Sequence, residues 1–261
     1  MPIRPPPRLA AALLATAVFA SASCHAGELD ARAALEDAKL YVTAPLRWDM
    51  QDWSYFGATV LAVAAAHEYD GNVRAHFGAP SPTATDPDPH ERRDWAPAAA
   101  MVGLTWASAI LLDNRDGHEE GKAMIEAAAF SAATTEVLKF AAGRRRPYET
   151  DRVDDWRASG SSFPSSHASI TFAIGTVLAE SGNDDFRWVR RALGYGAASA
   201  VAYSRVHDGA HWLSDTVAGA ALGIATGRFV THRADARRPP YAFGVQPVER
   251  GLMLTYTYVP R

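Results

Sequence analysis

Three short segments of the chain carry residue types that together could hold and cleave a phosphate ester. The first runs from Lys139 to Pro147, the second is Pro164 to His167, and the third runs from Ser204 to Asp215. Lysine and arginine can neutralise a tetrahedral oxyanion, and hydroxyl and backbone N–H groups can orient it. One histidine can attack phosphorus while a second protonates the leaving oxygen. Such a set needs no metal ion.

In the first segment, two cations are expected to converge from a helix and from the loop that follows it. Lys139 lies near the end of a helix-length stretch, Gly143 is a natural helix stop, and Arg146 precedes Pro147. Taken alone, this segment is more often an exposed lysine followed by a solvated run of arginines. The charges between Gly143 and Ser162 are expected mostly in solvent, except where an arginine turns inward.

The second segment predicts a helix start that faces an anion. A proline turn and two good N-capping residues, Ser165 and Ser166, precede the apolar run 168–178. Free backbone N–H groups and the positive end of the helix dipole favour an anion there, and Ser165 adds a hydroxyl donor. In isolation, a serine cap followed by a surface histidine, His167, is the commoner arrangement.

The third segment is the most specific of the three. His211 and Asp215 stand four residues apart, so on a helix they share a face. A carboxylate in that position fixes the imidazole tautomer and stabilises its cation, whereas the plainer alternative is a surface ion pair. Arg205 ends another helical stretch, and Asp208-Gly209 predicts a tight turn that brings the two helix ends together.

A metal site is a second interpretation of the same segment. His207, Asp208 and His211 are all possible ligands. This interpretation is weaker, because it leaves Arg205 unexplained and because no second acidic cluster follows, as a hydrolytic metal pair would need.

The elements that must position these residues are predicted to be helices. Apolar-rich stretches of helical length cover about 31–44, 53–68, 97–113, 121–142, 167–181, 187–205 and 211–231. Most fall short of the roughly 20 apolar residues that cross a bilayer, and charges such as Glu136 and Arg190 interrupt them. The sequence therefore favours an all-α helical bundle, soluble or peripheral, over a multi-span protein, although stretches 95–112 and 216–230 are apolar enough to touch lipid.

The remaining segments have distinct patterns. Gly219, Gly223 and Gly227 recur every fourth residue and predict a smooth helix face, for a buried contact or a membrane dimer motif. The proline-rich segment Gly71–Asp94 predicts a long surface loop, as a lid or a linker. At the end of the chain, stretches 241–245 and 252–259 alternate as strands do and predict a short C-terminal β-hairpin.

Composition and the first residues bound the class of protein. The chain has 261 residues, of which 48% are hydrophobic, and this suits one large domain. Acidic and basic residues nearly balance, at 29 against 26, so the net charge does not indicate a nucleic-acid partner.

Residues 1–26 read as a secretory signal peptide, which implies a periplasmic protein whose mature chain begins at Gly27. A cut after Ala22 and acylation of Cys24 are alternatives. The domains expected are then a helical domain at 27–238, with its motifs within 139–215, and a tail at 239–261.

The three segments resemble the signature of the type 2 phosphatidic acid phosphatase and vanadium haloperoxidase superfamily. They match Lys-x6-Arg-Pro, Pro-Ser-Gly-His and Ser-Arg-x5-His-x3-Asp in order and in internal spacing, and the resemblance spans about 119–228. It implies an all-α bundle, a phosphohistidine intermediate and no required cofactor or metal. The residue roles that it implies are phosphate binding by Lys139, Arg146 and Arg205, a hydrogen bond from Ser165, acid catalysis by His167, nucleophilic attack by His211 and orientation of that ring by Asp215.

One residue departs from this pattern. Ser166 stands where the family usually has glycine, so its backbone N–H survives but its side chain could crowd the phosphate. The signal peptide and modest hydropathy resemble the secreted, acid-phosphatase-like branch more than the polytopic lipid phosphatases, and an inner-membrane-associated protein is the alternative.

The function predicted from the sequence is therefore metal-independent hydrolysis of phosphate monoesters or pyrophosphates. Phe163, Trp212 and Leu213 adjoin the proposed catalytic residues and Trp156 lies in the connecting loop, which favours lipid phosphates unless these side chains simply pack the core. The alternatives are a non-specific acid phosphatase on soluble esters, a vanadate-dependent haloperoxidase, and a non-catalytic anion- or lipid-binding protein. The leaving group and the oligomeric state do not follow from the sequence.

Overall fold

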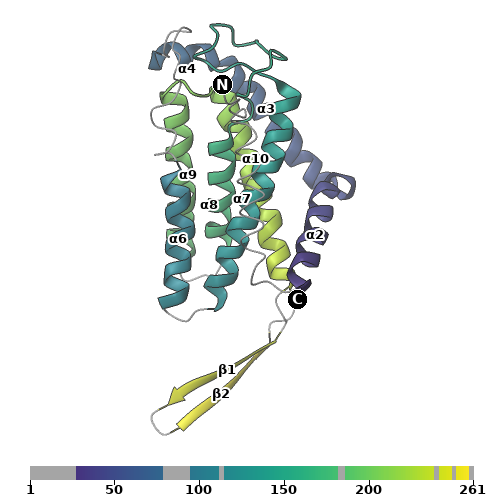
Figure 1. Cartoon of the computed structure of the whole chain (residues 1–261), viewed down its shortest axis with the longest axis vertical. Coiled ribbons are helices and arrows are strands. Elements are labelled where there is room, and N and C mark those ends of the chain that lie inside the picture. Colours follow the sequence, from purple (N-terminus) through teal and green to yellow (C-terminus); the bar gives the residue numbers. More distant parts are fainter. Residues whose placement is uncertain are drawn as a thin grey trace, which may run out of the picture.

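The structure, a computed structural model, describes residues 28–78, 95–111, 115–181, 186–237, 241–248 and 251–258. The predicted signal peptide, including Cys24, lies outside these residues. The described helices are α2 (Glu28–Val42), the 3₁₀ helix η1 (Ala44–Arg47), α3 (Met50–Glu68), α4 (Asp70–Phe77), α6 (Ala96–Leu111), α7 (Arg115–Ala142), α8 (Ser166–Glu180), α9 (Arg187–His207) and α10 (Leu213–Arg237). The predicted all-α helical bundle is confirmed (Figure 1).

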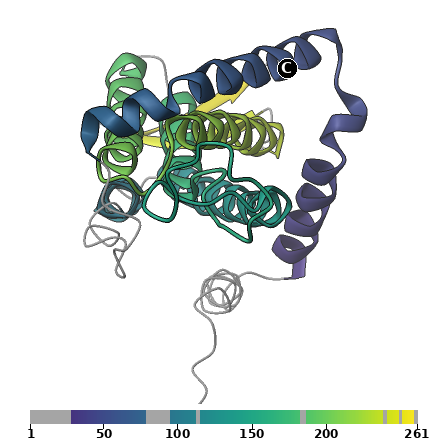
Figure 2. The same cartoon turned by 90° about the horizontal axis from the view of Figure 1, so that it is seen from above.

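Helix α8 lies at the centre of the bundle, and α6, α7, α9 and α10 pack around it (Figures 1 and 2). Most of its side chains are buried, as expected for a helix that is apolar on every face. The apolar core combines residues of four helices, among them Met101, Met124, Phe130, Ile174, Val177 and Val230.

The glycine face of α10 packs directly against α8, which confirms the prediction of a close helix contact. A Cβ atom at Gly219 would lie 2.6 Å from the Ser165 carbonyl oxygen, and one at Gly223 would lie 2.2 Å from that of Ser169. Real side chains do not approach so closely, so the glycines let the two backbones touch. This contact holds the start of α10 beside the start of α8.

Helices α2 and α3 run along the outside of the bundle (Figures 1 and 2). Tyr41 anchors α2, because its ring stacks on Phe130 at 5.0 Å and its hydroxyl lies 2.8 Å from that of Thr226. A capping box at Asp49 starts α3, which packs along α10 and leads into α4.

Helix α4 corrects the prediction that Gly71–Asp94 is a loop throughout. Residues 70–77 are helical, and α4 lies across the end of the bundle where the loop 143–165 is found (Figure 1). The helix forms because the prolines begin only at position 80, while Asp70 and Arg74 suit its two dipole ends. Gly78, with a φ of 65°, ends it. Residues 79–94 lie outside the described part of the chain.

The predicted C-terminal hairpin is present. Strands β1 (Tyr241–Val248) and β2 (Gly251–Tyr258) pair antiparallel, from Tyr241 opposite Tyr258 to Val248 opposite Gly251. It projects from the end of the bundle opposite α4 (Figure 1). It is therefore far from the residues considered below.

Candidate active site

The three motif segments meet at one end of the bundle. Lys139 lies in the last turn of α7, His167 in the first turn of α8, Arg205 in the last turn of α9, and Asp215 in the first turn of α10. Because α7 and α9 end where α8 and α10 begin, these four helix termini lie together under α4 (Figure 1).

The end of α7 places one cation at the edge of the core. Gly143 ends the helix in the left-handed region, with a φ of 56°, and its N–H donates to the Lys139 carbonyl. Lys139 is only 8% exposed, and its ammonium lies 3.7 Å from Glu136. Burial, followed by the charge of Arg146, lowers the pKa of Lys139 from 10.5 to about 8. Arg146 itself is partly exposed and stands over the ring of Tyr148.

The start of α8 has the cap that the sequence predicts. The Ser165 hydroxyl oxygen accepts from the Ala168 N–H at 3.5 Å, which leaves the hydroxyl proton for donation. The Ser165 N–H donates to the Asp215 carbonyl at 3.0 Å and so ties α8 to α10. The Ser166 hydroxyl is buried and has no hydrogen-bond partner within the described residues. His167 is buried, not on the surface, and its ring lies 4.1 Å from that of Trp95, just before α6.

The turn between α9 and α10 brings Arg205 and His211 together, as the sequence predicts. Gly209 adopts a φ of 66°, and the Arg205 carbonyl accepts from the N–H groups of Ala210 and His211, each at 3.1 Å. Arg205 is fully buried, with Asp208 3.5 Å away. The arginine is therefore held rigidly beside the histidine.

His211 is buried among positive charges. Burial, more than any other factor, lowers the pKa of His211 well below 6.5. Three cations lower it further, and a hydrogen bond with the Ser162 backbone acts in the opposite direction; the cations are Arg146, Lys139 and Arg205. The imidazole is therefore neutral at neutral pH, with a lone pair available as a nucleophile.

Asp215 contacts His211 less directly than a helical i, i+4 pair predicts. The helix begins only at Leu213, so His211 lies in the preceding turn, and its Nδ1 is 3.6 Å from Oδ2 of Asp215. That oxygen accepts instead from the Trp212 N–H at 2.9 Å and from the Ser162 hydroxyl. The carboxylate therefore caps its own helix and faces the imidazole at ion-pair distance.

Arg144 is the arginine that turns inward, and nothing in the sequence separates it from its two neighbours. It is fully buried, and its NH1 donates to Oδ1 of Asp215 at 2.7 Å. Its guanidinium carbon lies 4.5 Å from the centroid of the Trp156 ring and 5.1 Å from that of the Trp212 ring. The Asp215 pKa is raised by burial, and the strongest opposing effect is the charge of Arg144.

Asp70 is a second buried residue that the motifs do not contain. It lies in the first turn of α4, and its carboxylate accepts from Arg144 at 2.8 Å and from the Ser214 N–H at 2.9 Å. The sequence around Asp70 does not indicate this role. Asp70 lies between α3 and the proline-rich segment, far from the three motif segments in the chain.

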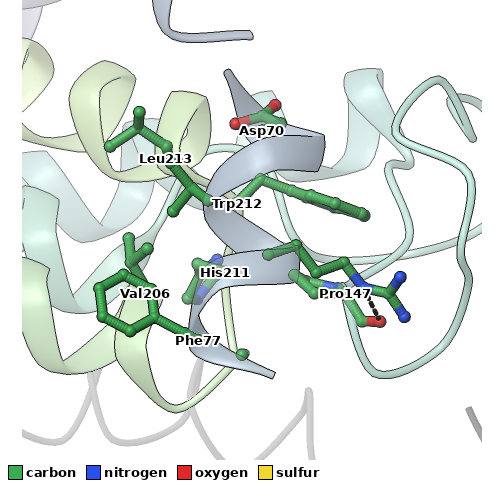
Figure 3. A pocket seen from close by; sticks show the side chains of 10 residues that line it. Asp70, Phe77, Pro147, Val206, His211, Trp212 and Leu213 are labelled. Carbon is green, nitrogen blue, oxygen red and sulfur yellow. Dashed lines mark hydrogen bonds between the residues drawn. The ribbon is translucent and has the colours of Figure 1, made fainter. Parts of the chain in front are cut away.

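A small pocket opens between α4 and the turn that carries His211 (Figure 3). Most of its wall is apolar and comes from three parts of the chain. The lining residues are Asp70, Val73, Arg74 and Phe77 of α4, Pro147, and Val206, Gly209, His211, Trp212 and Leu213 around the turn. Arg74 ties α4 to the loop, since it donates to the Pro147 carbonyl at 3.2 Å and to Asp151 at 2.6 Å.

The four side chains expected to surround the phosphate divide into two groups. Trp212 and Leu213 line the pocket, although Trp212 is also buried and donates to the Arg145 carbonyl at 2.8 Å. Phe163 and Trp156 pack on each other, with ring centroids 5.3 Å apart. Within the described residues, no group of three or more His, Cys, Asp or Glu side chains is arranged to hold a metal ion. His207, one of the possible metal ligands, pairs with Asp208.

The part of the chain that contains the three motif segments matches a known family. Residues 121–239 match the PAP2 superfamily. It is 35% identical over 89 residues to "Lipid A 1-phosphatase" of Porphyromonas gingivalis, which covers 34% of this chain and 18% of the relative.

A second curated relative is a "PA-phosphatase related-family protein" of Dictyostelium discoideum, 28% identical over 134 residues, or 45% of this chain and 49% of the relative. The chain thus spans less than half of the length of either relative. No solved structure gives a significant match. Among the described helices, none is both long and apolar enough to span a bilayer.

Proposed function

We propose that the protein is a metal-independent phosphatase that hydrolyses phosphate monoesters or pyrophosphates, with lipid phosphates preferred. The observation that supports this most is the environment of His211, a buried neutral imidazole beside three cations. A nucleophile that is itself uncharged can approach an anionic phosphate, while Lys139, Arg146 and Arg205 neutralise the charge that develops in the transition state.

In the proposed reaction, phosphorus moves from the substrate to His211 and then to water. Nδ1 of His211 faces Asp215, so Nε2 attacks phosphorus as the bond to the leaving oxygen breaks. His167 gives its proton to that oxygen. The resulting phosphohistidine carries positive charge, which the Asp215 carboxylate stabilises. His167 then takes a proton from water as the water oxygen attacks phosphorus, the P–N bond breaks, and phosphate leaves.

The apolar pocket supports the preference for lipid phosphates. Phe77, Val206 and Leu213 stand beside His211, where the part of the substrate beyond the phosphate would lie (Figure 3). Both curated relatives carry phosphatase names, and one of them is named for a lipid. A soluble ester would leave these apolar side chains without an apolar group to contact.

The first experiment measures phosphate release by the purified chain. We expect turnover to persist in EDTA, to be inhibited by vanadate, and to be lost in His211→Ala. His207→Ala is the matched control, because this histidine lies in the same motif but is exposed and pairs with Asp208. Loss of turnover on chelation, restored by zinc or magnesium, would contradict the proposal. Vanadate-dependent halide oxidation would indicate a haloperoxidase, and saturable phosphate binding without turnover would indicate a binding protein.

The lipid preference has its own test. We expect kcat/KM to be higher for a short-chain lipid phosphate than for a sugar phosphate, and Phe77→Ala to reduce the ratio. Phe140→Ala is the control, since Phe140 is 94% exposed and outside the pocket. If the wild type has the higher kcat/KM for the sugar phosphate, the lipid preference is wrong and the pocket residues only pack the structure.

We further propose that the chain is exported to the periplasm, on the pattern of residues 1–26. Mass spectrometry of protein recovered from cells is expected to find Gly27 at the N-terminus. An intact Met1 would refute cleavage, and a lipid on Cys24 would establish the lipoprotein alternative.

A further inference from the structure

A continuous chain of buried charges joins the proposed catalytic turn to α4. Asp215 lies next to His211, Arg144 binds Asp215, and Asp70 of α4 binds the other side of Arg144. The side chains of Asp70, Arg144 and Asp215 are all 0% exposed. The two Arg144 contacts measure 2.8 Å to Asp70 and 2.7 Å to Asp215. None of the three recognised motif patterns assigns a role to Asp70 or Arg144.

Stability alone does not account for this arrangement. Removing two carboxylates and a guanidinium from water is costly, and buried ion pairs are often no better for stability than well-packed apolar side chains. Three such charges in a row next to a nucleophilic histidine therefore indicate a role in the site.

Asp70 also fixes the backbone from which Asp215 projects. Its carboxylate accepts from the N–H of Ser214 at 2.9 Å and from the Ser214 hydroxyl at 2.6 Å. Arg144 donates to the same hydroxyl at 2.8 Å. Ser214 precedes Asp215 directly, so these bonds determine where the first turn of α10 begins. His67 contributes a further contact, with its Nδ1 2.9 Å from the Asp70 carboxylate.

The guanidinium between the two carboxylates is itself immobilised. The rings of Trp156 and Trp212 lie within 4.5 and 5.1 Å of it, and a further hydrogen bond runs from NH2 to the Val153 carbonyl at 2.8 Å. Arginine is suited to this position because its planar fork donates in two directions at once, whereas lysine is a point charge.

We propose that Asp70 and Arg144 are positioning residues, which hold the Asp215 carboxylate in place so that it orients His211 for attack. The inference rests on the proposed phosphohistidine chemistry. It makes α4, which lies outside the family match, a necessary part of the site. The cations proposed to bind phosphate are different residues, namely Lys139, Arg146 and Arg205.

The test separates positioning from phosphate binding. Asp70→Asn keeps the shape of the side chain and removes its charge, and Arg144→Gln breaks the same chain one step nearer His211. A displacement of about 1 Å can cost about 100-fold in rate, so we expect kcat to fall by about 10- to 100-fold in both variants. KM and the inhibition constant of inorganic phosphate are expected to stay within about twofold of wild type, because the cations remain.

The matched control is Arg145→Gln, which removes the adjacent arginine. The Arg145 side chain is exposed and pairs with Asp155 at 3.5 Å, so we expect wild-type kcat. The double variant Asp70→Asn with Arg144→Gln should be no slower than the worse single variant, because both changes break one chain. Near-ultraviolet circular dichroism and thermal melting give the folded fraction to which each kcat is referred.

Three outcomes would overturn the inference. The first is a wild-type kcat in folded Asp70→Asn, and the second is a rise in KM or in the phosphate inhibition constant that accounts for the whole effect. The third is a double variant whose kcat falls by the product of the two single-variant reductions. A wild-type protein that releases no phosphate would be a different failure, because it would remove the proposed function and this inference with it.

Discussion

Lys139 should confer an alkaline limit on activity, and Lys139→Arg should remove it. The pKa of Lys139 is lowered from 10.5 to about 8, first by burial and then by Arg146. Each pKa unit is worth about 1.4 kcal/mol, so the ammonium is about 3 kcal/mol less favourable in the empty site than in water. A bound phosphate dianion offsets this cost. The limit should therefore appear in kcat/KM, which reports the free enzyme, more than in kcat.

The magnitude follows from the titration of one group. At pH 9, about one pH unit above the Lys139 pKa of about 8, roughly a tenth of the enzyme is protonated at this position and kcat/KM should be about a tenth of its value at pH 7. The phosphate group of the substrate, with a second pKa of about 6, does not titrate in this range. Arginine stays charged throughout, so the Lys139→Arg profile should be flat from pH 7 to about 10.

The assay is phosphate release at low substrate concentration between pH 7 and 10, with folding checked at each pH. A wild-type profile that stays flat to pH 10 would refute the assignment of Lys139, and so would a Lys139→Arg profile that keeps the decline.

The pH dependence of the free energy of unfolding gives a second test of the Lys139 pKa. Above pH about 8 the unfolded chain binds more protons than the folded one, so the free energy of unfolding should rise with pH up to about 10.5. Lys139→Met should remove this rise.

Two further predictions concern packing and the unusual serine. Gly223→Ala places a Cβ atom 2.2 Å from the Ser169 carbonyl oxygen and should lower the free energy of unfolding by about 1–3 kcal/mol in urea denaturation. Gly196→Ala, in α9 with nothing within 4 Å, should raise it by about 0.5–1 kcal/mol, and equal effects of the two would contradict the packing account. Ser166→Ala should raise KM by about 5- to 20-fold with an unchanged melting temperature if its hydroxyl, which has no partner within the described residues, donates to phosphate. A wild-type KM would make Ser166 only a space-filling substitute for glycine.

The helical bundle and the meeting of the motifs could be predicted because local signals agree with the global fold. The glycines of α10 indicate a close contact, and Gly143 and Gly209 mark the turns at which α7 and α9 end. Given those elements, Lys139 and Arg205 fall at helix ends that face one another.

The residues that sequence reasoning missed depend on contacts between distant parts of the chain. Three consecutive arginines are chemically equivalent in the sequence, and contacts with Asp70, 74 positions away, with Asp215 and with two tryptophan rings select Arg144 for burial. Helix α4 is short, and its apolar residues serve the pocket more than the core, so its pattern resembles that of a loop.

The geometry of Asp215 was mispredicted for a local reason. Spacing alone places His211 and Asp215 on one helix face, but the helix begins after His211. The carboxylate then caps the Trp212 N–H, a competition between capping and side-chain pairing that spacing does not reveal.

The central claim is that His211 carries the phosphoryl group during turnover. The most direct measurement is mass spectrometry of peptides from enzyme quenched in alkali within the first turnovers, since phosphohistidine survives alkali and not acid. The account predicts a phosphoryl group on His211 in the wild type and none in His211→Ala. From an aryl phosphate, whose leaving group departs without a proton, it predicts a larger amount in His167→Ala, because the second step lacks its base. An active wild-type enzyme with no phosphoryl group on His211, or with one on another residue, would contradict it.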